Sequence, residues 1–195
     1  MELDSNIFKI EYNKVAPKRG RVLVSEPFLQ DTYFKRSLVL LTEYSEEGAV
    51  GFVINKPLDV QINEVMNNFP KFNSHVSIGG PVSTNTIHYL HSVGNHIPNS
   101  IQVADNLYWG GDYDIMKDLV MCGEIMPSQI RFFLGYSGWH AGQLESELSQ
   151  NSWLVTEVNY NKIMRPENDL WKNTVNQLGD KYKMWANFPE NPGSN

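Results

Sequence analysis

A chain of 195 residues is long enough to bury a hydrophobic core, and a composition of 41% hydrophobic and 19% charged residues is ordinary for a globular protein. The net charge of −6 argues against nonspecific nucleic-acid binding, and the lack of a run of about eighteen apolar residues excludes a membrane-spanning helix. Cys122 is the only cysteine, so an internal disulfide framework is excluded, and with no secretory signal pattern at the N-terminus we expect a cytoplasmic protein.

The first quarter of the chain predicts a leader followed by paired strands. Residues 1–16 form a polar leader that we expect to be peripheral, and the strands are expected over 21–25, 37–44 and 49–55. The second strand has an unbroken apolar centre from Leu38 to Leu41, so we expect it to be buried on both faces. A turn over 45–48 joins it to the third strand as a hairpin.

The middle of the chain predicts two helices separated by short strands. Asp59 is placed to cap a helix whose apolar residues recur at helical spacing from Ile62 to Phe69. Asp112 is placed to cap a second helix, which Gly123 ends. Between the helices, strands are expected over 75–78, 86–93, 101–103 and 107–109.

The segment 130–158 predicts a strand, a glycine-rich turn, a helix and a second strand. The apolar strand 130–134 is followed by three glycines within residues 135–142, a pattern that indicates a sharp change of direction. The helix after them carries a polar row with i, i+4 spacing that begins at Gln143 and Glu147.

The remaining residues predict two further helices and a tail. One helix is expected after Pro166 and another over 181–186, and residues 187–195 are expected to form a peripheral tail. Because we find no linker and no internal repeat, we expect residues 1–195 to form one domain. The strands come in hairpins with helices interspersed irregularly, which predicts a mixed sheet.

One stretch nearly matches a catalytic motif. Gly135-Tyr136-Ser137-Gly138-Trp139 departs from the nucleophile elbow Gly-x-Ser-x-Gly only at its last position. The only histidine after Ser137 is His140, three residues on, whereas hydrolases of this order place an acid and then a histidine farther along. A serine in a tight turn is the favoured interpretation, and we expect no catalytic residue here.

The histidines and glycine pairs show no metal or phosphate motif. His88 and His91 lie three apart on an expected strand and so point to opposite faces, and we expect no metal site and no cofactor. Gly79-Gly80 and Gly110-Gly111 lack the lysine of a P-loop and the third glycine of a dinucleotide fingerprint. A tight structural turn is favoured for both pairs over an anion site made of backbone amides.

Several stretches together resemble the YqgE/AlgH family of bacterial proteins, and they follow the family's order from about residue 20 to residue 155. These stretches are Gly20 to Pro27, Phe34 to Leu41, Gly48 to Pro57, Gly79 to Val82, Leu90-His91, Leu134 to Trp139, Gly142 to Leu148 and Asn151 to Leu154. The resemblance implies an α+β fold, in which a single domain has a mixed, bifurcated β-sheet curled into a pseudo-barrel with flanking helices. It implies no catalytic residue and no cofactor. One branch of the family is described as a transcriptional regulator of alginate production, without established DNA contact.

Two functions remain open. The first is a noncatalytic binding or regulatory protein that affects transcription indirectly, with a protein or small molecule as its partner. Direct DNA binding is not expected, and homo-oligomerisation is left open. The candidate binding surface comprises Asn55, Gly79, Gly80, Pro81, His91, Tyr136, Trp139, Gln143 and Glu147. The alternative is a small-molecule-binding enzyme, a hydrolase that uses Ser137 or His91 at the Gly135–Trp139 turn.

Overall fold

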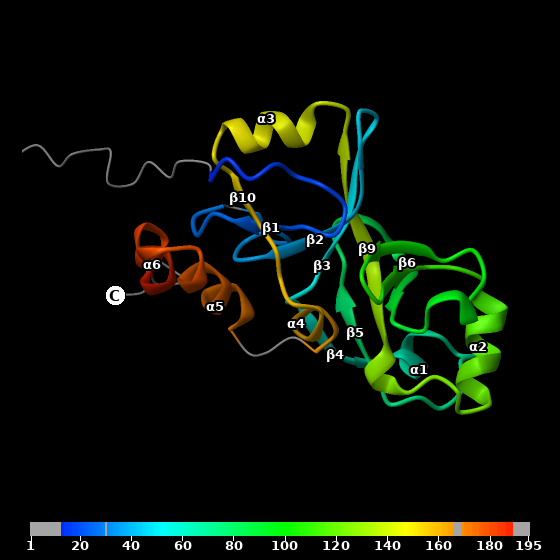
Figure 1. The fold of residues 1–195 in the computed structure, drawn as a ribbon. Coiled ribbons are helices and arrows are strands. Elements are labelled where there is room, and N and C mark those ends of the chain that lie inside the picture. The colour runs from blue at the N-terminus through cyan, green and yellow to red at the C-terminus, as the bar shows by residue number, and fades with distance from the viewer. Residues whose placement is uncertain (1–12, 30, 166–168, 189–195) are drawn as a thin grey trace, which may run out of the picture.

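The computed structural model describes residues 13–29, 31–165 and 169–188 (Figure 1). Most of the expected leader and tail, and Pro166, lie outside these residues. The described end of the leader is held in place, because the Asn13 side chain forms two hydrogen bonds with the backbone of Val155. Its Nδ2 donates to the Val155 carbonyl at 2.6 Å, and its Oδ1 accepts from the Val155 amide at 3.3 Å.

The described strands form one open, mixed sheet in the order β10-β1-β2-β3-β9-β6-β8-β7, with β4 and β5 branching from it. The strands are β1 (Val22–Ser25), β2 (Leu38–Ser45), β3 (Gly48–Val53), β4 (Pro57–Gln61), β5 (His75–Ile78), β6 (Val82–His91), β7 (Ile101–Ala104), β8 (Leu107–Trp109), β9 (Ile130–His140) and β10 (Trp153–Thr156). Every pair is antiparallel except β5 with β9. The predicted mixed sheet is therefore confirmed.

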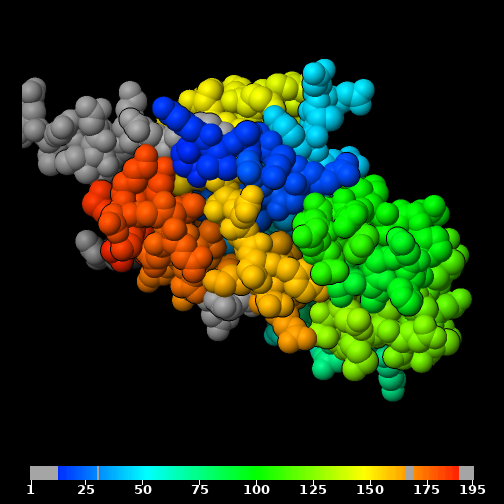
Figure 2. All heavy atoms as spheres, viewed as in Figure 1, coloured from blue at the N-terminus to red at the C-terminus, as the bar shows by residue number. Residues whose placement is uncertain are grey.

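Helices cover both faces of this sheet (Figure 1). They are α1 (Ile62–Val65), α2 (Tyr113–Met121), α3 (Gln143–Ser149), α4 (Tyr160–Met164), α5 (Leu170–Gln177) and α6 (Asp180–Asn187), with short 3-10 turns η2 (Gly94–His96) and η3 (Pro127–Gln129). The C-terminal helices and the β6–α2 region lie at opposite ends of the molecule, shown in red-orange and green in Figure 2. Within the described residues, no helix has the length and apolar character needed to cross a membrane.

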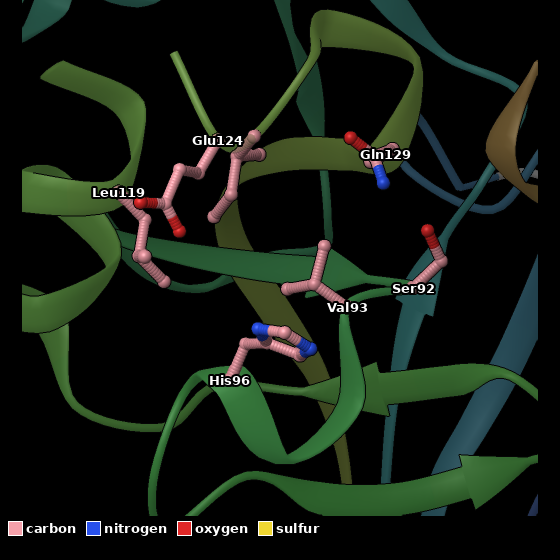
Figure 3. A pocket seen from close by; sticks show the side chains of 7 residues that line it. Ser92, Val93, His96, Leu119, Glu124 and Gln129 are labelled. Carbon is pink, nitrogen blue, oxygen red and sulfur yellow. The ribbon is translucent and has the colours of Figure 1, made fainter. Parts of the chain in front are cut away.

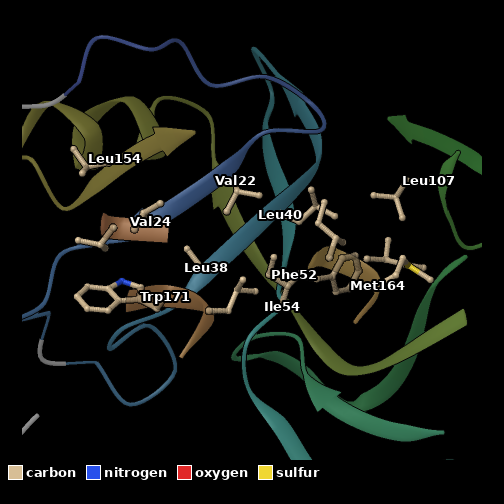
Figure 4. Packing of buried hydrophobic residues seen from close by; sticks show 14 of the residues in the cluster. Val22, Val24, Leu38, Leu40, Phe52, Ile54, Leu107, Leu154, Met164 and Trp171 are labelled. Carbon is tan, nitrogen blue, oxygen red and sulfur yellow. The ribbon is translucent and has the colours of Figure 1, made fainter. Parts of the chain in front are cut away.

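The core is divided into three clusters that follow from this layering. The largest lies between the sheet and α4 to α6, and it includes Leu38 and Leu40 of β2 and Trp171 of α5 (Figure 4). Alternate residues of β2, Val39 and Leu41, point to the opposite cluster under α3. The expected burial of β2 on both faces is confirmed. A third cluster lies beneath α1 and α2.

The sheet forks along β9, which is the bifurcation that the family resemblance implies. The first half of β9 pairs with β5 on one side and β6 on the other, and its second half pairs with β3. Gly79 occupies the fork: its amide donates to the Leu134 carbonyl, and its carbonyl accepts from the Val53 amide, both at 2.8 Å. A Cβ at Gly79 would lie 2.2 Å from the Gly135 carbonyl oxygen, so only glycine fits there.

The sheet also curls without closing. β7 packs near β2, and a Cβ on Gly20 would lie 2.8 Å from the Val103 carbonyl oxygen of β7. The strand order nevertheless ends at β10 and β7, so hydrogen bonding does not complete a barrel. The expected pseudo-barrel is thus an open one.

The predicted turn at Gly135–Trp139 is wrong. These residues belong to β9, which continues without a break from Ile130 to His140. Gly135 has φ +65° and stands where the β6–β9 register shifts between Val82 and Ile87, so this glycine marks an irregularity within a strand.

The predicted helix from Asp59 to Phe69 is also largely wrong. Residues 57–61 form β4, which pairs with β5, and the helix is a single turn, α1, with Gln61 as its N-cap. Strand pairing with a distant segment overrides the local helical spacing here. The helix that follows Asp112 is confirmed, since the Asp112 carboxylate accepts from the amides of Asp114 and Ile115.

Candidate ligand-binding site

The structure separates the expected binding surface into several places. The Asn55 side chain forms two hydrogen bonds with the backbone at the start of β2. Its Oδ1 accepts from the Leu38 amide at 2.8 Å, and its Nδ2 donates to the Arg36 carbonyl at 2.9 Å. Gly79 and Gly80 lie at the fork of the sheet, where a Cβ on Gly80 would be 2.3 Å from the Tyr136 carbonyl oxygen. The neighbouring Pro81 is exposed. These contacts explain the glycine pair by backbone packing.

Trp139, Gln143 and Glu147 do come together, between β9 and α3. The Glu147 carboxylate accepts from the Trp139 indole at 2.8 Å through Oε2 and from Gln143 Nε2 at 2.9 Å through Oε1. Trp153 of β10 donates a further indole hydrogen bond to the same Oε2 at 2.8 Å. The carboxylate therefore joins α3 to two strands, and its oxygens are engaged by the protein itself.

Ser137 is unsuited to act as a nucleophile in this structure. Its side chain is fully buried, and its hydroxyl donates to the Gly79 carbonyl at 3.0 Å. The nearest histidine in sequence, His140, lies at the exposed end of the same strand. A hydrolase site at Gly135–Trp139 therefore lacks both its turn and an accessible hydroxyl.

His91 is completely buried beneath the Gly110-Gly111 turn. Its Nε2 lies 3.0 Å from the Gly110 carbonyl oxygen and 2.9 Å from Ser100 Oγ, while Nδ1 has no partner among the described residues. Burial lowers the pKa of His91, and the contact with Gly110 opposes this shift. The imidazole is therefore a neutral structural support at neutral pH.

Tyr136 lies on the β6 side of β9. Its ring makes an edge contact with His88, at 5.6 Å between centroids. Burial lowers the pKa of His88, which leaves this imidazole neutral at neutral pH as well. His88 and His91 do not share a site, as their spacing on a strand predicts.

A buried cation, Arg131, was not anticipated from the sequence. It is surrounded by carbonyl and hydroxyl oxygens: it donates to the Ile163 carbonyl, to the Ile54 carbonyl at 3.2 Å and to Ser77 Oγ at 2.9 Å. Burial lowers its pKa to about 10. Arg131 therefore ties β5 and β9 to the segment after β3 and to α4, and it is not exposed to a ligand.

A ligand-sized pocket lies between α2, η2 and η3, and we call it the α2–η2 pocket. Its volume is about 450 Å³. Four polar residues line it, Ser92, His96, Glu124 and Gln129, together with Val93, Leu119 and Ile125. Figure 3 shows the Glu124 carboxylate on the Leu119 side, the His96 ring opposite, and the Ser92 hydroxyl pointing toward Gln129.

Local signals at the end of α2 place these side chains. Gly123, with φ +75°, ends the helix as predicted, and the Glu124 amide then turns back to the Leu119 carbonyl at 2.9 Å. The η3 turn is fixed by Gln129, whose Oε1 accepts from the Met126 amide at 2.9 Å. The Gln129 carbonyl in turn accepts from the Ser92 amide at 3.0 Å, which joins η3 to the end of β6.

The polar side chains of this pocket retain hydrogen-bonding capacity. Within the described residues, Ser92 Oγ, the His96 ring, the Glu124 carboxylate and Gln129 Nε2 have no hydrogen-bond or ion-pair partner, whereas most of the expected site residues are already paired. Glu124 carries the only formal charge among the lining residues. The pocket therefore favours a neutral or cationic ligand over an anionic one.

The same residues do not form a catalytic or metal centre. The Ser92 hydroxyl points toward Gln129 and not toward His96 (Figure 3), so a serine–histidine pair is not assembled. No cluster of three or more His, Cys, Asp or Glu side chains in the described part of the chain is suited to a metal ion. Sequence reasoning did not single out Ser92, Glu124 or Gln129, because each stands alone in sequence without a motif.

The forked open sheet, the helices on both faces and the accessible pocket define an α+β protein with a ligand-sized site. The chain belongs to the AlgH-like family, whose model (DUF179) matches residues 22–183. A UPF0301 protein of Bacteroides thetaiotaomicron is 43% identical over 198 residues, covering 100% of both chains. A UPF0301 protein of Parabacteroides distasonis is 43% identical over 190 residues, covering 96% of each.

Solved structures share this fold. The solution structure of AlgH from Pseudomonas aeruginosa matches with a TM-score of 0.70 and 26% identity, covering 90% of this chain and 97% of AlgH. The crystal structure of DIP2367 from Corynebacterium diphtheriae matches with a TM-score of 0.72 and 23% identity, covering 92% and 95%, respectively. The implied family and α+β fold are thus confirmed.

Proposed function

We propose that this protein is a noncatalytic binding protein, and that its ligand is a small molecule with an amino group held in the α2–η2 pocket. One observation carries this proposal: four polar side chains without partners in the described structure surround an apolar floor in a cavity of about 450 Å³. Pockets that combine apolar walls with a few convergent polar groups are typical of small-molecule sites.

The charge of the pocket selects the amino group. Glu124 supplies a carboxylate, and no lysine or arginine lines the cavity. A protonated amine would pair with Glu124 while its carbon chain covers Val93, Leu119 and Ile125. The Ser92 hydroxyl can accept a hydrogen bond from a second amino group at the other end of the ligand.

Any effect on transcription is proposed to be indirect, through ligand-dependent contact with another protein in the cytoplasm. The net charge of −6 supports this view, because an acidic protein is poorly suited to DNA phosphates. The four polar groups come without an assembled nucleophile and base, which supports binding without catalysis.

The experiment is a titration of the ¹⁵N-labelled protein with putrescine as the amine probe, followed by amide and side-chain NMR. We expect saturable shifts confined to the pocket, at residues such as Ser92, His96 and Gln129. The variant Glu124→Gln is expected to bind about fivefold more weakly, because an exposed ion pair contributes up to about 1 kcal/mol.

The matched control is Asp118→Asn, which removes the same charge from an exposed position of α2 outside the pocket. It should leave putrescine binding unchanged. Equal weakening by both variants would show that net charge and not the pocket attracts the amine, and no saturable shift in the wild type would contradict the proposal.

A further inference from the structure

A second cavity, at the other end of α2, has a different chemical character, and we call it the aromatic pocket. It has a volume of about 470 Å³. Four of its lining residues carry ring side chains, and Asn99 contributes a carboxamide. The ring residues are His88, Tyr89, Trp109 and Tyr113. None of the lining residues is a lysine, arginine, aspartate or glutamate.

Trp109 differs from the other tryptophans of the chain. It is partly exposed at the wall of this pocket, whereas Trp139, Trp153, Trp171 and Trp185 are at most 6% exposed. The indole contacts the Phe52 ring, at 5.7 Å between centroids, and the His88 ring, at 6.4 Å. The indole N–H has no partner among the described residues and is not enclosed by the protein, so it is available to a ligand.

The Gly110-Gly111 turn at the wall of this pocket is held by hydrogen bonds to buried and half-buried residues. The Gly110 carbonyl accepts from Ser100 Oγ at 3.2 Å and lies 3.0 Å from His91 Nε2, and the Gly111 carbonyl accepts from Tyr89 Oη at 2.8 Å. Backbone bonds from Gly110 to Tyr89 and from Asp112 to Pro98 complete the anchoring. A pocket held in this way loses little conformational freedom when a ligand binds.

The Asn99 carboxamide is an unpartnered polar group at the wall of the aromatic pocket. The residue occupies a left-handed conformation with φ +60°, and its carboxamide, which has both a donor and an acceptor end, has no partner within the described structure. The aromatic side chains offer a surface on which the face of a flat ring can stack. The indole N–H and the carboxamide can form hydrogen bonds with nitrogen and oxygen atoms at the edge of that ring.

We infer that the aromatic pocket binds an uncharged, planar heteroaromatic ring of nucleobase size, which stacks on Trp109 and forms hydrogen bonds with Asn99. Base stacking on an aromatic side chain requires no charge, and His88, whose pKa is lowered by burial, adds none at neutral pH. A phosphate has no basic partner among the lining residues, so a nucleoside fits better than a nucleotide or a nucleic acid strand.

The test is a titration of the full chain with adenosine, guanosine, cytidine and uridine at millimolar concentration, with the Trp109 indole N–H observed by ¹⁵N NMR. At least one nucleoside should shift this resonance in a saturable way. The matching 5′-monophosphate and a short single-stranded RNA should bind more weakly.

Two variants localise the binding. Trp109→Ala removes both the stacking surface and the indole probe, so its titration is followed through backbone amide shifts, and it should bind about tenfold or more weakly. Asn99→Gly removes the carboxamide at a position where glycine tolerates the backbone, so it should weaken binding without unfolding the chain. Glu124→Gln, in the α2–η2 pocket, should have no effect on nucleoside binding.

The inference is overturned if no nucleoside shifts the Trp109 resonance, or if Asn99→Gly binds as tightly as the wild type. Tighter binding of the monophosphate or the RNA would overturn it as well, since a phosphate site would then dominate. None of these outcomes bears on putrescine binding at Glu124, so this inference and the proposed function fail separately.

Discussion

Glu147 Oε2 lies 2.8 Å from the indole nitrogen of Trp153, and it also accepts the indole hydrogen bond of Trp139 at 2.8 Å. One carboxylate oxygen thus satisfies two indoles that come from β9 and β10. The two tryptophan rings contact each other edge to face at 6.0 Å between centroids, beneath α3. This arrangement explains the polar row of α3 as a structural clamp.

The variant Glu147→Gln is expected to lower the free energy of unfolding by about 2 kcal/mol, because two hydrogen bonds to a charged acceptor are weakened. Chemical denaturation followed by tryptophan fluorescence measures the change. Glu46→Gln, in the exposed 45–48 turn, is the control and should stay within about 0.5 kcal/mol of the wild type. Equal stability of the two variants would refute the clamp.

Alanine substitutions at Gly135 and Gly142 test whether β9 requires a glycine near the fork of the sheet, with Gly142 as the matched control. Both have left-handed φ values, +65° and +73°, but a Cβ on Gly135 would lie 2.7 Å from the Val82 carbonyl oxygen, whereas Gly142 has nothing within 4 Å. Gly142→Ala should therefore cost about 1 kcal/mol from conformation alone. Gly135→Ala should cost at least about 2 kcal/mol more, or fail to fold.

Thermal unfolding of both alanine variants checks this expectation. Similar melting temperatures would mean that the backbone near Gly135 relaxes easily, and the fork would not depend on glycine at that position.

The glycines of this segment also show where sequence reasoning stops. Glycines are locally typical of turns, so the sequence predicts a turn over 135–139. In the structure they allow β9 to pass other backbones closely while it remains a strand. The error at residues 57–61 has a related cause, since β4 exists because β5 pairs with it. By contrast, β2 and α2 are predictable from their own sequences, because β2 has an unbroken apolar centre and α2 begins after the capping residue Asp112.

The candidate site was harder to predict for the same reason. Glu124 and Gln129 follow the predicted end of α2, but no local pattern states that Ser92 and His96 lie across from them. Most residues of the expected surface contact other parts of the chain. Asn55 and Glu147 are examples.

Arg131 provides a prediction about the buried centre. Arg131→Met keeps much of the side-chain volume but leaves the Ile54 and Ile163 carbonyls and Ser77 Oγ without their donor. We expect a loss of about 3 kcal/mol in the free energy of unfolding. Arg19→Met, at an exposed position, serves as the control and should change stability by less than about 0.5 kcal/mol.

His91 predicts a pH dependence of stability. Burial places its folded-state pKa below the ordinary value of 6.5, so the unfolded chain binds the proton more readily. The contribution of neutral His91 is present above pH 6.5 and is lost as the pH falls from there toward the folded pKa. The free energy of unfolding should therefore decrease more steeply with acidification in the wild type than in His91→Gln.

The measurement is a series of urea denaturation curves between about pH 7 and pH 5 for both proteins. A glutamine at this position keeps a donor for the Gly110 carbonyl but does not titrate. Parallel stability curves over this range would contradict the buried, neutral state of His91.

The α2–η2 pocket is proposed to hold a small molecule with an amino group. Native mass spectrometry of the protein purified gently from its own cells reports whether this pocket is occupied, with Glu124→Gln and Asp118→Asn purified in parallel. We predict one bound amine per chain in the wild type and in Asp118→Asn, and reduced occupancy in Glu124→Gln. A wild-type chain without a bound small molecule, or with one that Glu124→Gln retains equally, would contradict the account.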